Sequence, residues 1–153
     1  MNQTYFLGID VGSTTAKLVL AHSRDDGTAD VEQVIYETYE RHFSRVREKI
    51  LDLLDGLPLD GEVAVSAAIS GSAGLGLSQA IGVPFVQEVF ATGEVVKMLA
   101  PDTSAVVELG GEDAKIIFLS GGLEERMNGS CAGGTGAFID QMATLLNVSS
   151  DEL

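Results

Sequence analysis

The sequence predicts an α/β domain with a five-stranded mixed sheet and helices on both faces. Three apolar segments separated by short polar turns lie at the amino end of the chain, which predicts an antiparallel meander. Strand-like and helix-like segments alternate after the meander, and this alternation is typical of a sheet covered by helices. The length of 153 residues suits one domain, so we expect residues 1–153 to form a single subdomain.

The individual elements follow from local patterns. Tyr5–Leu20 is apolar, turns through Gly, Ser and Thr, and is then apolar again, which predicts two strands. His42–Leu54 has apolar residues at helical spacing and ends before Gly56 and Pro58. Glu62–Ser70 consists largely of small residues, which predicts a strand buried on both faces. The other expected strands are Val31–Tyr39, Pro84–Glu88, the two arms of Ala105–Leu119, and Leu123–Met127, and the other expected helices are Leu75–Ile81, Ala91–Ala100 and Gly133–Leu146.

Composition excludes several functions. The net charge is −14, from 9 Lys and Arg against 23 Asp and Glu, which argues against a nucleic-acid partner because such a partner needs a basic face. No segment reaches the ~18 apolar residues of a membrane span, and the single cysteine excludes an internal disulfide. We therefore expect a cytoplasmic protein without a membrane partner. An acidic protein still binds nucleotides where Mg²⁺ and a nest of backbone N–H groups offset the repulsion.

The turn of the first hairpin has the composition of an anion-binding loop. Gly12 has no Cβ and lets the backbone approach a bulky anion closely. Successive backbone N–H groups in such a turn form an anion-binding nest, and side-chain hydroxyls add donors. Asp10 ends the first strand, where it is placed to hold a metal ion or its waters, and Lys17 adds a positive charge. The hydroxyl residues of this turn are Ser13, Thr14 and Thr15.

The second hairpin repeats the design of the first. Aligned residue by residue, Asp10, Gly12, Ala16 and Lys17 correspond to Glu108, Gly110, Ala114 and Lys115. Two hairpins that each carry an acid, a glycine turn and a lysine predict two loops that bind one phosphate-bearing ligand from opposite sides. The alternative is that both are ordinary hairpins, in which the glycines serve only the turn.

Two further glycine-rich segments each precede a predicted helix. The spacing in Gly71–Gly76 is GxxGxG, not the dinucleotide fingerprint GxGxxG, so we expect a close backbone passage there. Cys131 lies within Asn128–Gly136, where the start of a helix stabilises a thiolate. Cys131 is therefore a candidate metal ligand or reactive thiol, and the alternative is a small buried apolar residue.

Three other polar residues have open roles. Glu88 ends the predicted strand Pro84–Glu88, where it is placed to orient a water for attack on a phosphate, and the alternative is a surface carboxylate. His22 and His42 are isolated and lack metal-ligand spacing, so we expect both at the surface.

Three motifs in order resemble those of a known family. GIDVGSTTAK and ELGGEDAK resemble the two phosphate loops of the actin, Hsp70 and sugar-kinase superfamily, which has a ribonuclease H-like fold. NGSCAGGTGAF is similar to the cysteine motif of the activator ATPases of 2-hydroxyacyl-CoA dehydratases and benzoyl-CoA reductases, the CoA-substrate-specific enzyme activases. In that family the motif carries one of two cysteines that ligate a 4Fe–4S cluster shared across a homodimer. The resemblance covers nearly the whole chain but only the first half of such an ATPase domain, so the adenosine-binding half and the second cysteine would lie outside this chain.

The resemblance implies a role for each matched residue. Asp10 would organise Mg²⁺ through water, and the first loop would hold the β- and γ-phosphates of ATP. Glu108 stands where this family usually has Asp, and Cys131 would be a cluster ligand in the intact dimer. The residues expected to bind the nucleotide are Gly12, Ser13, Thr14, Thr15, Lys17, Gly110, Gly111, Glu112, Gly134, Thr135 and Gly136. The residues expected to be catalytic are Asp10 and Glu88, and those expected to face Mg²⁺ are Asp10 and Asp113.

The implied function is an ATP-driven electron gate. In the intact protein, a homodimer or an internally duplicated chain, ATP hydrolysis would let the cluster pass a low-potential electron to a dehydratase or reductase acting on an acyl-CoA. We expect this chain alone to bind nucleotide weakly or not at all and to be inactive, because half of the cleft is missing. The alternatives are a carbohydrate or carboxylate kinase of the same superfamily and an actin-like assembly module, and neither needs a thiolate at that helix start.

Overall fold

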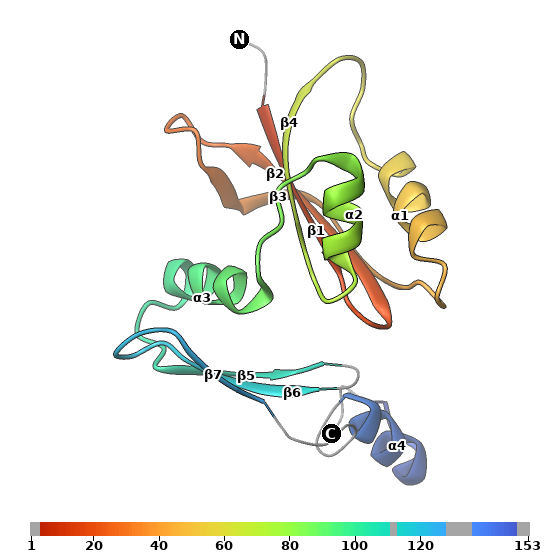
Figure 1. Ribbon diagram of the computed structural model, residues 1–153, viewed down its shortest axis with the longest axis vertical. Helices are drawn as coiled ribbons and strands as arrows, with labels where there is room; N and C mark the ends of the chain where they lie inside the picture. Colours follow the sequence, from red (N-terminus) through yellow and green to blue (C-terminus); the bar gives the residue numbers. More distant parts are fainter. Residues whose placement is uncertain (1–3, 111–112, 128–135, 150–153) are drawn as a thin grey trace. The chain divides into compact units, whose positions relative to one another are not determined.

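The computed structural model describes residues 4–110, 113–127 and 136–149, and the chain divides into two compact units (Figure 1). The first unit is Met1–Gln87 and the second is Glu88–Leu153. Each unit has its own sheet, of four strands in the first and three in the second. The predicted single sheet of five strands is therefore not observed in the described residues. The assignment of both units to one subdomain of a larger ATPase domain stays a prediction.

The first unit contains β1 (Thr4–Val11), β2 (Thr15–Ser23), β3 (Ala29–Arg41), α1 (Val46–Asp55), β4 (Ala64–Ser70) and α2 (Gly74–Ile81). The strand order is β3-β2-β1-β4. The first three strands form the predicted antiparallel meander, and β4 pairs with β1 in parallel. A parallel neighbour needs a crossover connection, which α1 supplies. The sheet is therefore mixed, as predicted.

One apolar cluster fills the first unit. Leu7, Ile9 and Val11 alternate along β1 and are buried, because every second residue of a strand faces the same side. Ile50 of α1 is buried in the same cluster, and Leu77 of α2 packs against it. Both helices of the first unit thus join one core, so its described residues place helices on one face of the sheet and not on both.

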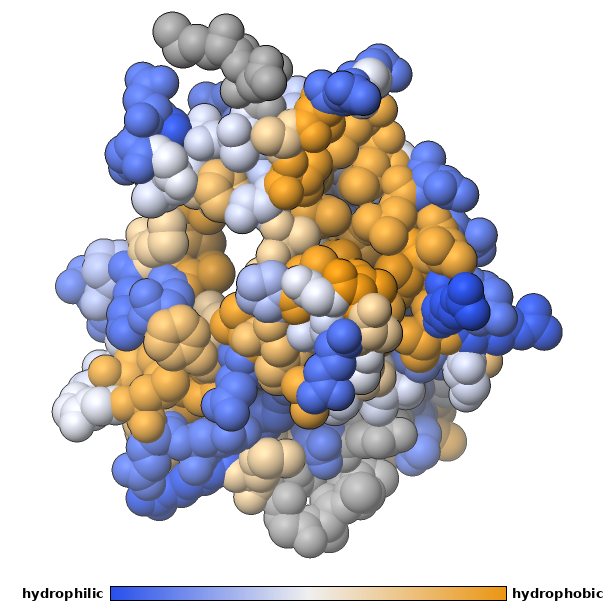
Figure 2. Space-filling view, turned by 45° about the horizontal axis from the view of Figure 1, so that its top comes forward, coloured by the Kyte–Doolittle hydropathy of each residue, from blue (hydrophilic) through white to orange (hydrophobic). Residues whose placement is uncertain are grey.

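The small-residue strand β4 is less buried than predicted. Of its seven residues only Ile69 is fully buried, and Val65 is 40% exposed. Exposed apolar residues are not confined to β4, because apolar residues cover a broad part of the visible face in Figure 2. The prediction that this strand is buried on both faces is therefore wrong for the described residues.

The predicted strand Pro84–Glu88 is reduced to a single bridge beside β4. Ile69 donates its backbone N–H to Pro84 O at 2.9 Å and accepts from the N–H of Val86 at 2.8 Å. The segment cannot extend this ladder through Pro84, which has no N–H, and at Glu88 the chain enters a helix. A carboxylate in the first turn stabilises the helix dipole. Glu88 therefore begins a helix and does not end a strand.

The second unit contains α3 (Glu88–Leu99), β5 (Ala105–Leu109), β6 (Ala114–Phe118), β7 (Glu124–Met127) and α4 (Gly136–Leu146). The three strands are antiparallel in the order β5-β6-β7, which confirms the second hairpin and the strand after it. The predicted start of the last helix at Gly133 lies outside the described residues. No helix among the described residues is long and apolar enough to cross a membrane.

Candidate phosphate-binding site

The first hairpin is a tight turn between β1 and β2. Val11 pairs with Ala16, and the N–H of Gly12 donates to Thr15 O at 2.9 Å, which closes the turn. Ser13 and Thr14 lie at the tip and are exposed. Within the described part of the chain, the N–H groups of Ser13 and Thr14 have no hydrogen-bond acceptor. The tip therefore offers two free backbone donors and two hydroxyls to an anion.

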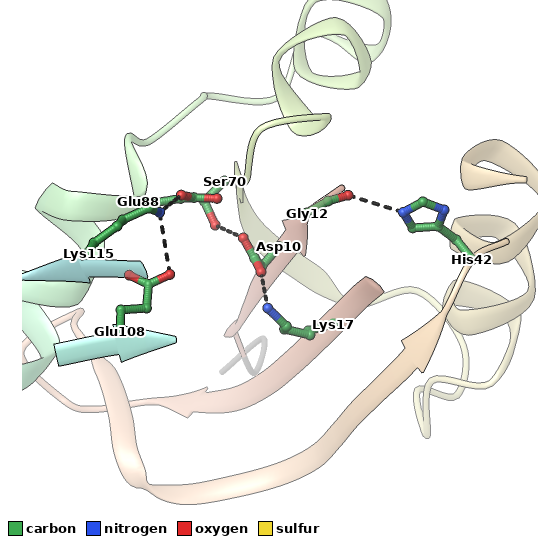
Figure 3. Close-up of polar contacts among 8 residues, drawn as sticks. All are labelled: Asp10, Gly12, Lys17, His42, Ser70, Glu88, Glu108 and Lys115. Atoms are coloured by element: carbon green, nitrogen blue, oxygen red, sulfur yellow. Dashed lines mark hydrogen bonds and ion pairs between the residues drawn. The ribbon is translucent and has the colours of Figure 1, made fainter. Parts of the chain in front are cut away.

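Asp10 lies beside this turn and is held at both carboxylate oxygens (Figure 3). Lys17, its partner in the β1–β2 register, donates to Oδ2 at 2.7 Å. Ser70, its partner in the β1–β4 register, donates to Oδ1 at 2.9 Å. The Asp10 side chain is 27% exposed, so solvent reaches the carboxylate. This arrangement fixes the carboxylate and leaves it accessible.

The Asp10 carboxylate suits Mg²⁺ that is bound through water. Among the described residues, no three His, Cys, Asp or Glu side chains gather as a ready-made metal site. Mg²⁺ keeps several waters and often uses only one or two carboxylates plus phosphate oxygens. A single ordered carboxylate beside free N–H donors fits that requirement.

His42 is buried, which contradicts the surface position predicted for it. It is 5% exposed and lies beside the first turn. Its backbone N–H donates to Thr14 O at 3.2 Å, and its Nε2 lies 3.1 Å from Gly12 O. The N–H of Ser44 donates to Nδ1 at 3.1 Å. Because Nδ1 accepts, the ring proton is on Nε2, which donates to the Gly12 carbonyl.

The second hairpin has the same construction as the first. Glu108 pairs with Lys115 and Leu109 with Ala114 in the β5–β6 register. The N–H of Gly110 donates to Asp113 O at 2.8 Å, which matches the bond that closes the first turn. The predicted residue-by-residue correspondence of the two hairpins is therefore confirmed between the described residues of β1–β2 and β5–β6.

Lys115 joins two carboxylates in the second unit (Figure 3). Its Nζ donates to Glu88 Oε2 and lies 3.4 Å from Glu108 Oε1. The Lys115 side chain is 12% exposed. Burial alone lowers the pKa of Lys115, but the hydrogen bond to Glu88 and the charges of both carboxylates outweigh it and raise that pKa above its ordinary value. Glu108 Oε2 is buried and has no hydrogen-bond partner among the described residues.

The other glycine-rich segments are partly described. Gly71 has φ +94°, and a Cβ there would lie 2.2 Å from Val11 O, which confirms the predicted close backbone passage. The N–H of Gly136, at the start of α4, donates to Gly110 O at 2.8 Å, so the second loop contacts that helix start. The expected site residues Gly111, Glu112, Cys131, Gly134 and Thr135 lie outside the described residues.

Sequence reasoning missed Ser70 and His42 beside the first loop. Ser70 ends the strand parallel to β1, and the pairing of Asp10 with Ser70 follows from a register that the sequence does not fix. For His42 a signal existed, because the third strand of the meander must return towards the first turn, where Arg41 pairs with Thr15.

The chain matches one protein family over most of its length. Residues 7–153 match the model of the BadF/BadG/BcrA/BcrD ATPase family. A relative from Clostridioides difficile, a 2-hydroxyisocaproyl-CoA dehydratase activator, is 32% identical over 152 residues, which are 97% of this chain and 55% of the relative.

Two solved structures are also similar to this chain. Component A of the (R)-2-hydroxyglutaryl-CoA dehydratase from Acidaminococcus fermentans is 25% identical with a TM-score of 0.73, over 97% of this chain and 56% of that one. The activator of the 2-hydroxyisocaproyl-CoA dehydratase from Clostridium difficile with bound ADPNP is 25% identical with a TM-score of 0.71, over 97% and 54%. The chain spans about half the length of these relatives. It has the actin-like ATPase fold and belongs to the BadF/BadG/BcrA/BcrD ATPase family.

Proposed function

We propose that this chain supplies the first half of an ATP-hydrolysing activator. In its intact form, a homodimer or an internally duplicated chain in the cytoplasm, this activator passes an electron through a 4Fe–4S cluster to a dehydratase or reductase acting on an acyl-CoA. The names of the relatives support this class, since three of them are named as activators of 2-hydroxyacyl-CoA dehydratases. The bound ADPNP of one relative supports a nucleotide ligand.

The observation that carries the proposal is the first hairpin. Its tip presents the unbonded N–H groups of Ser13 and Thr14, and Asp10 lies beside it with both oxygens held. Backbone donors at such a turn suit phosphate oxygens, and a carboxylate next to them suits the hydrated cation of a metal–nucleotide complex. We assign the second hairpin the same chemistry, with Gly110, Gly111 and Glu112 as its loop.

Asp10 and the two residues that contact its carboxylate have defined tasks in this proposal. Asp10 accepts hydrogen bonds from the waters around Mg²⁺ and so fixes the position of the metal–nucleotide complex. Lys17 and Ser70 hold the Asp10 carboxylate in one orientation, so the carboxylate does not have to reorient during the reaction. Mg²⁺ itself, when bound, neutralises charge on the phosphates.

Glu88 and Asp113 belong to the second unit. We propose that Glu88 orients the attacking water, and its hydrogen bond to Lys115 fixes the position of the carboxylate. Asp113 closes the second turn through its backbone carbonyl, which accepts the N–H of Gly110. We propose that this side chain faces the metal.

The residues of this chain do not by themselves hold the iron–sulfur cluster. The chain has one cysteine, whereas a 4Fe–4S cluster takes about four thiolates. We therefore derive no step through the cluster and propose only that Cys131 supplies one of its ligands in the intact protein. The contact from Gly136 to Gly110 supports a link between the second loop and the helix that follows the cysteine segment. We propose that Gly134 and Thr135 take part in the same link.

The proposal is tested by Asp10→Asn in the full-length protein. Loss of the carboxylate charge should lower the kcat of Mg²⁺-dependent ATP hydrolysis by about 10²–10³-fold, a size typical for one preorganised electrostatic group. Asp30→Asn is the control, because Asp30 pairs with Arg24 at the surface and belongs to no proposed site. Turnover in Asp10→Asn equal to that of Asp30→Asn would show that the first loop is only structural.

A further inference from the structure

His42 contacts the first loop at two points, and nothing in the proposed chemistry assigns it a task. Its ring donates to Gly12 O and its backbone N–H to Thr14 O, so one residue binds two carbonyls of a four-residue turn. We propose that His42 is a positioning residue that holds these carbonyls away from the anion side, so that the loop presents N–H donors to a phosphate. This inference rests on the proposed function of the loop.

The geometry of the peptide bond explains how the contact acts. In a trans peptide the C=O of one residue and the N–H of the next point in opposite directions. A Gly12 carbonyl held by His42 therefore points the N–H of Ser13 away from the histidine. That N–H is one of the two unbonded donors at the exposed tip of the turn in the described part of the chain. Without the histidine this peptide plane is free to rotate, and a carbonyl turned outwards would repel a phosphate.

The backbone after His42 supports a specific role. Phe43 and Ser44 have φ values of +48° and +62°, the left-handed region that residues with a Cβ rarely adopt. In this conformation the N–H of Ser44 reaches Nδ1 of His42 and so selects the tautomer that donates through Nε2. Backbone strain of this kind persists where the surrounding structure needs it.

Two substitutions separate the hydrogen bond from the packing of the ring. His42→Phe keeps an aromatic ring in a position that is 5% exposed but removes the donor to Gly12 O. His42→Gln keeps an N–H donor at about the position of Nε2. The control is Ser78→Ala, which removes another buried hydrogen bond of the first unit, from Ser78 Oγ to Val83 O at 2.7 Å, away from the loop.

The experiment measures ATP hydrolysis and amide hydrogen exchange in the full-length protein. His42→Phe should raise KM for ATP about ten-fold and change kcat much less, because the loop contacts phosphate oxygens in both the ground and transition states. It should also speed exchange in the segment 10–16. The KM of His42→Gln should stay within about two-fold of the wild-type value, because the hydrogen bond to Gly12 O is retained. Ser78→Ala should change neither KM nor exchange at the loop.

The outcomes are distinguishable from failure of the proposed function. An unchanged KM in a folded His42→Phe protein overturns the inference, as does a His42→Gln protein impaired as strongly as His42→Phe, because the ring and not the donor would then matter. If the wild type hydrolyses no ATP, the proposed function is wrong. Exchange at the turn then decides the role of His42, and unchanged protection in His42→Phe overturns it.

Discussion

Replacing Lys115 by Met should destabilise the second unit markedly. Lys115 is the cation between Glu88 and Glu108, and its side chain is 12% exposed. Methionine has a similar length and keeps the packing of the aliphatic stem, but it leaves two carboxylates without their shared counter-charge. Glu108 already has one buried oxygen without a partner, so the substitution adds an uncompensated charge to a site that is poorly hydrated.

The loss of stability expected for Lys115→Met lies between two limits. Exposed ion pairs contribute about 0–1 kcal/mol, and removing one partner of a fully buried pair costs about 3–5 kcal/mol. The side chains of Glu88 and Glu108 are 29% and 35% exposed, so solvent screens part of the effect. We expect a loss of about 2 kcal/mol, which lowers a urea midpoint by about 1 M at a typical slope.

The assay is urea denaturation followed by circular dichroism, with amide exchange in β5 and β6 to locate the change. Lys97→Met is the matched control, because its pair with Glu94 is exposed at 58% and 50% and should contribute less than about 0.5 kcal/mol. Adding Glu108→Gln to Lys115→Met should restore part of the loss. Equal midpoints for Lys115→Met and Lys97→Met would refute the reasoning.

The remaining predictions concern pH, backbone space and the cysteine. Because the pKa of folded Lys115 is raised above 10.5, its contribution is complete below pH 10.5 and is lost as pH rises through the folded pKa, so the stability gap between wild type and Lys115→Met should close only in that alkaline range. Gly71→Ala should cost about 3 kcal/mol or more, since its Cβ would lie 2.2 Å from Val11 O, whereas Gly76→Ala, with no atom within 4 Å, should be neutral or stabilising by thermal denaturation. Cys131→Ala should abolish the iron–sulfur absorbance of the reconstituted full-length protein and leave ATP hydrolysis at least partly intact, and a full complement of iron and sulfide in that variant would show that Cys131 is no ligand.

Local features of the fold could be predicted from the sequence. The two hairpins depend on short-range patterns, an apolar run, a glycine turn and a second run, and the same short spacing sets the pairing of Asp10 with Lys17 and of Glu108 with Lys115. The match between the hairpins was visible for the same reason.

Features that depend on distant contacts could not be predicted. The meander indicates that the third strand returns towards the first turn, but the burial of His42 there depends on the length and register of β3, which the sequence does not fix. Pro84–Glu88 has the composition of a strand, but the segment makes one bridge and a helix begins at Glu88. The exposure of β4 depends on what packs against it, which small residues alone do not determine.

The central claim is that the turn between β1 and β2 binds the phosphates of ATP. The most direct measurement is a crystal structure of the full-length protein with ADPNP and Mg²⁺. The account predicts β- or γ-phosphate oxygens within about 3 Å of the N–H groups of Ser13 and Thr14, and a metal-bound water hydrogen-bonded to Asp10. A nucleotide bound elsewhere, with that turn empty, would contradict it.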